Sequence, residues 1–317
     1  MIICGPKKEI MKTISLLFFL GFSVTPSYSY EVKIPLYFAT SADKNYYECL
    51  INLIGSLHQT NYDDLGQIAI FDLGLEQEQI NDLNAMEKVH VYQLEMTNPY
   101  LLTPFNTRCF GKPVPGWFSW KPVAIKQALD MFPYVFYMDA GTTVYKSLKD
   151  FFRYLLYKGY FFHNGFDWPI RFITTTYVIE KLQLHSPERE WTLGDTCYHL
   201  EAGHMGLTRA YYNSFVLPVY EHTKDIKMFE DDATAQGGFG ACRNDQTLYS
   251  IYAYLLGLTI HHHNSNPEQP LLLDLCGQKI PFQIASLSEY KNEHTHVYCS
   301  RTWEVKAEYY RQFIHYR

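Results

Sequence analysis

The stretch Tyr134-Val-Phe-Tyr-Met-Asp139-Ala-Gly141-Thr-Thr-Val144 decides how the fold is interpreted. A run of apolar and aromatic residues ends in one carboxylate, and small and hydroxyl residues follow at once. This pattern predicts a buried strand that carries Asp139 to its carboxyl end. Because open α/β sheets bind their ligands beyond the carboxyl ends of the strands, we expect Asp139 to lie at a binding site.

Asp139 also has a purely structural interpretation, in which its side chain caps the next turn through Thr142 or Thr143. A carboxylate that ends a buried strand needs a partner for its charge. The functional interpretation is therefore preferred.

The residues before this stretch alternate between strand and helix patterns. Strands are predicted over residues 33–39, 67–72 and 89–92, and helices over residues 46–57 and 76–86. The segment from Thr40 to Asp43 can cap the first helix. Such alternation predicts a mostly parallel, Rossmann-like sheet.

The remaining segments complete this picture. A loop is predicted over 98–116, followed by a helix that Ser119 caps and that holds Pro122 in its first turn. Further predictions are a helix over 147–157, a strand over 160–163, a strand over 201–209, a helix over 243–256 and a strand over 258–262, with 172–182 ambiguous between helix and strand. No repeat or linker divides the chain, so we predict one domain over residues 30–317.

Composition excludes several classes of protein. The 317 residues are 47% hydrophobic, 17% aromatic and 19% charged, as in a globular protein with a sizeable core. The net charge of -6 lacks the basic footprint of nucleic-acid binding. The phosphate-loop, dinucleotide, His-Glu-x-x-His and Gly-x-Ser-x-Gly motifs are all missing from the sequence.

The first 29 residues have the pattern of a signal peptide. A basic start at Met11-Lys12-Thr13 precedes an apolar run over 14–24 and the small-x-small site Ser27-Tyr28-Ser29. We expect cleavage before Tyr30 and export to a secretory lumen, the periplasm or the cell exterior, with translation starting at Met1 or Met11. An uncleaved anchor is the alternative, and only then would a membrane be a partner.

Cysteines are spread widely through the sequence. Six of the seven remain after removal of the leader, which permits up to three disulfides in an exported chain. No Cys-x-x-Cys pair occurs, so the sequence does not predict a zinc site. Buried thiols are the alternative.

Four segments, in order, resemble glycosyltransferase family 8 and its relatives with the GT-A fold. They are residues 38–47, which resemble the first strand–helix unit; Asp139-Ala-Gly141, which resembles the Asp-x-Asp motif; Glu201-Ala-Gly203-His-Met, which resembles an Asn-Ala-Gly strand; and Asp245-Gln246. The resemblance spans roughly residues 33–263. Gly141 replaces an Asp of the family pattern, and Glu201 replaces an Asn.

This resemblance implies a single GT-A domain, α/β with a mostly parallel sheet, that binds a nucleotide sugar. The residues implied in donor or nucleotide binding are Ala39, Thr40, Tyr46, Lys121, Asp139, Gly141, Gly203 and Gln246. Glu201 and Asp245 would line the sugar site. Family 8 implies retention, for which no base is needed, whereas an inverting enzyme would need a carboxylate such as Asp245.

A divalent cation is the implied cofactor. An Asp-x-Asp motif holds Mn²⁺ or Mg²⁺ with two hard oxygens, and Gly141 removes one of them. Asp139 would bind the ion together with Asp245, Glu201 or a histidine, or would instead accept a ribose or sugar hydroxyl. On a strand His261 and His263 would share a face, and family 8 has a metal-binding histidine in its C-terminal region.

A lysine and two tryptophans near the predicted site each have two alternative roles. Lys121 would neutralise phosphate in place of a metal, or would be a solvated lysine near a helix start. Trp117 and Trp120 would stack on a base or an acceptor sugar, or would belong to the core.

The leading hypothesis is a glycosyltransferase that moves a sugar from a nucleotide-diphosphate donor to a hydroxyl of a glycan, protein or lipid. The alternative is a catalytically silent, exported GT-A domain that acts as a carbohydrate-binding or interaction protein. Gly141 and the export signal favour the alternative, because nucleotide sugars are made in the cytosol.

Overall fold

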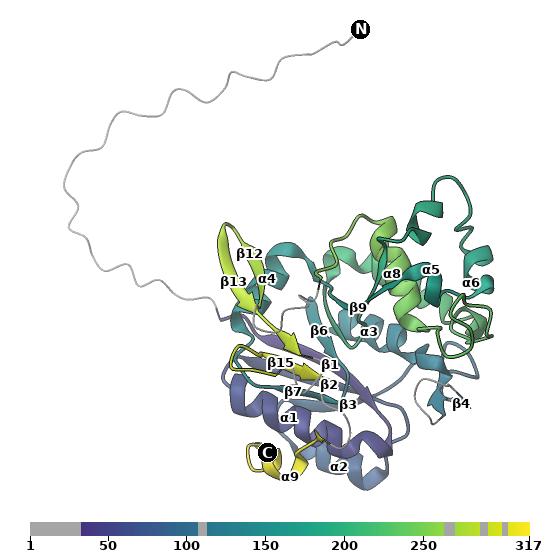
Figure 1. The fold of residues 1–317 in the computed structure, drawn as a ribbon. Helices are drawn as coiled ribbons and strands as arrows, with labels where there is room; N and C mark the ends of the chain where they lie inside the picture. Colours follow the sequence, from purple (N-terminus) through teal and green to yellow (C-terminus); the bar gives the residue numbers. More distant parts are fainter. Residues whose placement is uncertain (1–32, 107–112, 263–269, 286–290, 300–303) are drawn as a thin grey trace, which may run out of the picture. The chain divides into compact units, whose positions relative to one another are not determined.

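A six-stranded sheet in the order β3-β2-β1-β6-β11-β8 forms the centre of the computed structural model (Figure 1). The structure describes residues 33–106, 113–262, 270–285, 291–299 and 304–317. The strands of the sheet are β1 (Leu36–Ala42), β2 (Leu65–Asp72), β3 (Val89–Gln93), β6 (Tyr134–Met138), β8 (Tyr160–Phe161) and β11 (His204–Thr208). The pairs among β1, β2, β3 and β6 are parallel, whereas β11 runs antiparallel to β6 and β8. The predicted mostly parallel α/β fold is confirmed.

The strand that ends at Asp139 separates two hydrophobic cores. Val135 and Tyr137 of β6 belong to one core, and Tyr134, Phe136 and Met138 belong to the other. This alternation follows from the two-residue period of a strand. Because both faces are covered, β6 is buried along its whole length, as the apolar run predicts.

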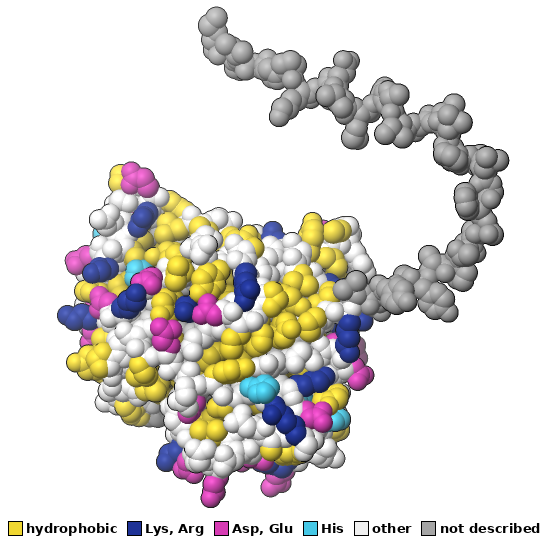
Figure 2. Space-filling view, turned by 180° about the vertical axis from the view of Figure 1, so that it is seen from behind, with side chains coloured by type: hydrophobic (Ala, Val, Ile, Leu, Met, Phe, Trp, Pro, Cys, Tyr) yellow, Lys and Arg dark blue, Asp and Glu magenta, His cyan; other side chains and the backbone are white. Residues whose placement is uncertain are grey.

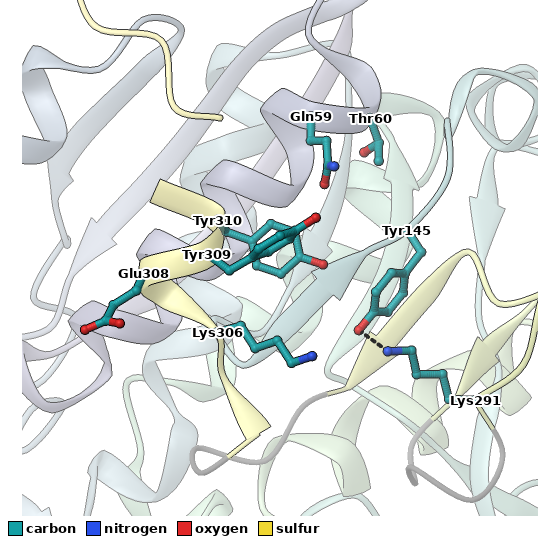
Figure 3. A pocket seen from close by; sticks show the side chains of 8 residues that line it. All are labelled: Gln59, Thr60, Tyr145, Lys291, Lys306, Glu308, Tyr309 and Tyr310. Carbon is teal, nitrogen blue, oxygen red and sulfur yellow. Dashed lines mark hydrogen bonds between the residues drawn. The ribbon is translucent and has the colours of Figure 1, made fainter. Parts of the chain in front are cut away.

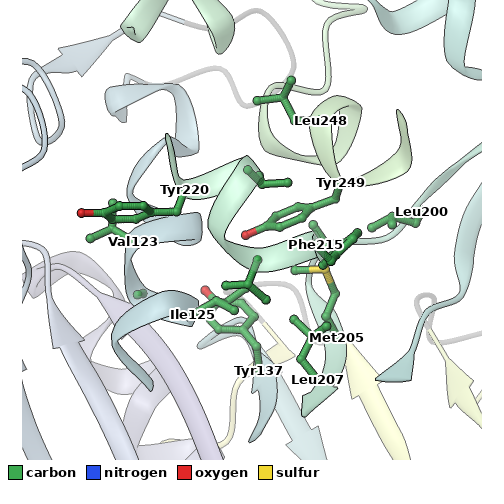
Figure 4. Packing of buried hydrophobic residues seen from close by; sticks show 14 of the residues in the cluster. Val123, Ile125, Tyr137, Leu200, Met205, Leu207, Phe215, Tyr220, Leu248 and Tyr249 are labelled. Carbon is green, nitrogen blue, oxygen red and sulfur yellow. The ribbon is translucent and has the colours of Figure 1, made fainter. Parts of the chain in front are cut away.

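Helices cover both faces of the sheet. One core includes residues of α1 (Tyr47–Asn61), α2 (Gln77–Ala85), α4 (Lys149–Lys158) and α9 (Ala307–Arg311). The other includes residues of α3 (Trp120–Met131), α5 (Ile170–Ile173), α6 (Thr176–Lys181), α7 (Leu217–His222) and α8 (Asp245–Leu255). In Figure 4 Tyr137 of β6 lies in this second core with Val123 and Ile125 of α3 and with Tyr249 of α8.

Beyond Asp139 the chain enters a second, smaller sheet. β7 (Thr142–Val144) pairs with β15 (Val297–Cys299), which pairs with β14 (Ile284–Ala285). Two further strand pairs lie outside both sheets. One is the short hairpin of β12 (Leu271–Leu275) and β13 (Gln278–Phe282), and the other pairs β9 (Asn164–Pro169) with β10 (Tyr198–Leu200). The C-terminal region is thereby attached to the strand that follows Asp139.

The predicted capping segment of the first helix, Thr40 to Asp43, is correct only at Asp43. Thr40, Ser41 and Ala42 belong to β1, where they pair with Ile70, Phe71 and Asp72 of β2. They therefore cannot cap a helix. Asp43 alone has the capping role, and its carboxylate accepts a hydrogen bond from the Asn45 amide at 2.9 Å.

The start of α3 is predicted in place but not in mechanism. Pro122 lies in the first turn, as expected, whereas the Ser119 hydroxyl makes no capping hydrogen bond. Trp117 and Phe118 have left-handed backbones with φ of 47° and 65°, so the chain enters the helix through a strained turn. The two-residue strands β4 (Pro104–Phe105) and β5 (Val114–Pro115) pair just before this turn, in the region predicted as a loop.

Two predictions in the second half need correction. Residues 258–262 form no strand, and His261 makes only an isolated bridge with His163. The ambiguous region 172–182 is mostly helical, with the end of α5 and all of α6. The predicted helix near Asp245 is confirmed as α8.

Contacts divide the chain into Met1–Lys33 and one compact unit, Ile34–Arg317. The proposed leader, residues 1–29, lies outside the described residues. Among those that are described, no helix is both long and apolar enough to cross a membrane.

No disulfide joins any two of the five cysteines that the structure describes. On the face drawn in Figure 2, basic and acidic side chains are interspersed, without the broad basic patch of a nucleic-acid binder.

The contact between α1 and α9 predicts a sharp response to one methyl group. A Cβ added to Gly55 would lie 2.2 Å from the backbone oxygen of Tyr310. We expect Gly55→Ala to lower the free energy of unfolding by about 1–3 kcal/mol, although alanine favours helices by about 1 kcal/mol. Urea unfolding measures the change, with the exposed Glu48→Ala on α1 as control. A Gly55→Ala protein as stable as the parent would contradict the close contact.

Candidate functional site

Asp139 lies where the prediction placed it, directly after β6. Its amide donates to the Gly203 carbonyl oxygen at 2.9 Å, which fixes it beside the start of β11. Its side chain is 40% exposed, so the carboxylate faces solvent in part. The Thr142 hydroxyl is bonded to His204 Nε2, and the Thr143 hydroxyl accepts from Asn52. The side-chain cap through these threonines, which was the structural alternative, is therefore not observed.

The principal partner of Asp139 is Lys121, which sequence patterns do not connect with it. Lys121 is 3% exposed, and its Nζ lies 3.1 Å from Asp139 Oδ1 and 3.3 Å from Asp245 Oδ2. The interpretation of Lys121 as a solvated lysine is wrong. The Tyr137 hydroxyl, which was not predicted as a site residue, also donates to Asp139 Oδ1 at 3.1 Å.

Two hydrogen bonds hold the Glu201 side chain near Asp139 and Asp245. The Gly203 amide and the Gln246 side-chain amide both donate to Glu201 Oε1 at 3.0 Å. A Cβ on Gly203 would lie 2.9 Å from Asp139 Oδ2 and 3.1 Å from Glu201 Oε1. Only glycine therefore lets the backbone approach both carboxylates this closely.

We call Lys121, Asp139, Glu201 and Asp245 the charged cluster. Burial raises the pKa of Asp245 to about 6, although Lys121 lowers it, and burial followed by Asp139 raises the pKa of Glu201. Burial alone would lower the pKa of Lys121, but the carboxylates outweigh it and raise that pKa. A carboxyl that titrates near neutrality beside a partly exposed one is typical of sites that move protons.

A cavity of about 200 Å³ adjoins the cluster at the carboxyl ends of β1 and β6. We call it the rim pocket; its lining includes Ser41, Tyr46, Phe118, Trp120, Asp139 and Gly141. The rings of Phe118 and Trp120 lie 6.1 Å apart along it. The pocket therefore combines flat apolar faces with the carboxylates of Asp43 and Asp139.

Other predicted residues are distributed differently. Ala39 and Thr40 are buried inside β1 and do not line the rim pocket, whereas Ser41 and Ala42, which lie within the predicted segment 38–47 but were not named as site residues, do. Trp117 stacks on Phe105 with ring centroids 3.9 Å apart, so it belongs to local packing. Ser41 and Tyr137 could have been found by counting alternate positions along their strands.

The described residues do not fit a divalent-metal site. Asp139 Oδ1 already contacts Lys121 and Tyr137, Gly141 offers no carboxylate, and no three metal-binding side chains gather within the described ranges. The His261 imidazole is bonded to the Tyr154 hydroxyl at 3.0 Å and stacks on Phe161. His263 lies outside the described residues.

Solved glycosyltransferases are among the structures that are similar to this chain. No family model and no curated protein matches the sequence. The galactosyltransferase LgtC, solved with donor and acceptor sugar analogs, has 11% identity over 88% of this chain and 95% of that chain, with a TM-score of 0.47.

Mouse xyloside xylosyltransferase 1, solved in its apo form, has 10% identity over 86% of this chain and 99% of that chain, with a TM-score of 0.45. Core-mannan synthase A from Aspergillus fumigatus, in a Mn/GDP form, has 12% identity over 72% of each chain and a TM-score of 0.44. Because identity and TM-scores are this low, the function proposed below rests on the geometry of the site.

Removal of the Lys121 charge tests whether the buried ion pairs hold the cluster together. We expect Lys121→Met to lower the free energy of unfolding by about 3–5 kcal/mol at neutral pH, because two carboxylates lose their counter-charge. The loss should shrink at acidic pH, where Asp245 takes up a proton. Lys126→Met on the same helix, which breaks a more exposed pair with Asp130, should cost about 1 kcal/mol or less. If denaturant unfolding gave equal losses of free energy for the two variants, Lys121 would not be the buried counter-charge of the cluster.

A second carboxylate at position 141 tests the metal prediction. Gly141 lines the rim pocket and its φ is not positive, so an aspartate fits its backbone. We expect Gly141→Asp to bind Mn²⁺ about tenfold or more tightly than the parent, because a charged ligand adds about 1.5–3 kcal/mol. Calorimetric titration measures this, with Gly141→Asn as the uncharged control. Unchanged affinity would mean that position 141 does not face the ion.

Proposed function

We propose that the protein is a glycosyltransferase that moves a sugar from a nucleotide-diphosphate donor to an acceptor hydroxyl. The observation that carries this proposal is the charged cluster. Its members come from α3 and α8, from the residue directly after β6, and from the segment just before β11. The cluster lies beside the rim pocket, at the carboxyl ends of parallel strands. Open α/β sheets bind their ligands at this place.

The rim pocket supports binding of the nucleotide. Tyr46 and the adjacent rings of Phe118 and Trp120 offer flat apolar faces, which suit a base. Ser41, Ala42, Asp43 and Asn45, at and just after the end of β1, also belong to the lining. The nucleoside would therefore lie against the end of β1, within the segment 38–47 that resembles the first strand–helix unit of family 8.

The charges favour one of the two roles predicted for Asp139. The cluster has three carboxylates and one ammonium, so an anionic diphosphate gains little from approaching it closely. Ionised carboxylates only accept hydrogen bonds, and hydroxyl groups of a ribose or a sugar donate them. Asp139, as the exposed member, would accept such a hydroxyl while the diphosphate lies further out in the pocket.

The reaction would replace one bond at the anomeric carbon with another. The acceptor oxygen bonds to that carbon, the bond to the diphosphate breaks, and the nucleotide diphosphate leaves with the electron pair. In an inverting reaction Asp245 is the candidate for the proton of the acceptor hydroxyl, because its pKa of about 6 is close to neutrality. In a retaining reaction the departing diphosphate takes this proton, so no protein base is needed.

The classes of acceptor and the location that we propose are those expected from the sequence. The acceptor hydroxyl would belong to a glycan, a protein or a lipid. The leader predicts that the chain meets it in a secretory lumen, the periplasm or the cell exterior. In such a compartment the nucleotide sugar must be imported.

The Asp139 carboxylate provides the sharpest test. Asp139→Asn is nearly isosteric and leaves Lys121 paired with Asp245, so the fold should persist. We expect affinity for the nucleotide sugar to fall about 10- to 100-fold, because a charge-assisted hydrogen bond contributes about 1.5–3 kcal/mol. A thermal-shift screen of nucleotide diphosphates and their sugars, with and without Mn²⁺, first identifies the donor; its affinity is then measured on both proteins.

Asp130→Asn, a carboxylate at the far end of α3, is the matched control and should bind the donor like the parent. A well-folded Asp139→Asn protein with unchanged affinity would remove the donor site from the rim pocket. Donor binding without turnover on any acceptor would instead support the silent carbohydrate-binding protein.

A further inference from the structure

A second cavity, larger than the rim pocket, lies between the C-terminal end of α1, the start of α9 and the residues next to β7 and β15. Its volume is about 780 Å³, within the usual range of ligand sites, about 300–1,000 Å³. Its lining includes Gln59, Tyr145, Lys291, Lys306, Tyr309 and Tyr310 (Figure 3). We call it the lysine pocket. It shares no lining residue with the rim pocket.

The charge facing this cavity is positive, although the whole chain has a net charge of -6. Lys291 Nζ donates to the Tyr145 hydroxyl at 2.7 Å and lies 4.1 Å from the centre of that ring. Neither Lys291 nor Lys306 forms an ion pair with any residue in the described ranges. Glu308 lines the margin, and its carboxylate points away from Lys306 in Figure 3. The pocket therefore offers two ammonium groups to an anion.

The uncharged lining suits a sugar ring. Tyr309 is 50% exposed and stands at 83° to Tyr310, which leaves a flat aromatic face for the C–H side of a ring. Gln59 lies on the exposed side of α1 and can donate to and accept from hydroxyl groups. Thr60 is already committed, because its hydroxyl donates to Ser56 and accepts from Asn61.

The walls of the pocket are fixed by the fold. The Lys306 amide donates to Asn52 Oδ1 at 3.0 Å, and the Tyr145 amide donates to the His296 carbonyl oxygen at 2.9 Å. Tyr310 is 5% exposed and lies against Gly55 of α1. A ligand would therefore meet a largely preformed site, which reduces the entropy lost on binding.

We propose that the lysine pocket binds an acidic sugar unit of a glycan, a pyranose that carries a carboxylate or a phosphate group. The anionic group lies between Lys291 and Lys306, the ring lies against Tyr309, and its hydroxyl groups reach Gln59. A small inorganic anion would use the lysines alone and leave the aromatic wall empty. This site is independent of the proposed transferase reaction.

Titration of the mature chain with matched probes tests the proposal. Glucuronic acid, N-acetylneuraminic acid and glucose 6-phosphate combine the ring with the charge, whereas glucose, acetate and inorganic phosphate each have one of the two. We expect the combined probes to shift the NMR signals of the pocket and to bind at least about tenfold more tightly than either part alone. Added salt should weaken the binding.

Variants then assign the binding to this pocket. Lys306→Gln and Tyr309→Ala change exposed side chains, so both should fold, and each should weaken the acidic sugars about tenfold or more. Lys181→Gln, an exposed lysine on α6, should leave the affinity unchanged. Acetate or phosphate binding as tightly as the acidic sugars would overturn the sugar assignment. Glucose binding as tightly as the acidic sugars would overturn the role of the two lysines. If no probe bound, or if Lys306→Gln left the binding unchanged, the lysine pocket would not be the binding site.

Discussion

The ion pairs of one buried ammonium group organise the centre of this molecule. Lys121 is 3% exposed, and an ammonium in such a place is costly unless carboxylates surround it. Asp139 and Asp245 provide them from β6 and α8, at 3.1 and 3.3 Å. The fold can therefore bury Lys121 only when α3, β6 and α8 meet at one point. Removal of one partner from such a pair is strongly destabilising, because it leaves an unpaired charge in the interior.

The same constraint accounts for the small residues nearby. Glu201 approaches Asp139 because Gly203 has no Cβ, which would lie 2.9 Å from Asp139 Oδ2. Gln246 follows Asp245 in α8 and donates to Glu201. The start of α8 therefore contributes Asp245 to the charged cluster and also binds a second member, Glu201. Three carboxylates thus share one ammonium in a partly closed space. The pKa of Asp245 is raised to about 6 as a consequence of that burial.

Local sequence patterns predicted the helices and strands better than the contacts between them. The strand ending at Asp139 was predictable, because a continuous apolar run requires burial on both faces. The Lys121 contact was not, since no periodicity links residues 18 positions apart. β15 and β7 are three residues each, and their pairing joins segments far apart in sequence. The opposite error occurs at residues 258–262, where a strand was predicted and His261 makes only an isolated bridge with His163.

The two pockets differ in the charges that line them. A neutral sugar finds no ionic partner at the lysine pocket, whereas an acidic sugar meets two ammonium groups there. Only residues 140–144 separate Asp139 from Tyr145, so β7 connects the two places directly. Specificity depends on what a site rejects as well as on what it binds. The lysine pocket would therefore reject neutral units for lack of an ionic partner, which makes its two ammonium groups the basis of its selectivity.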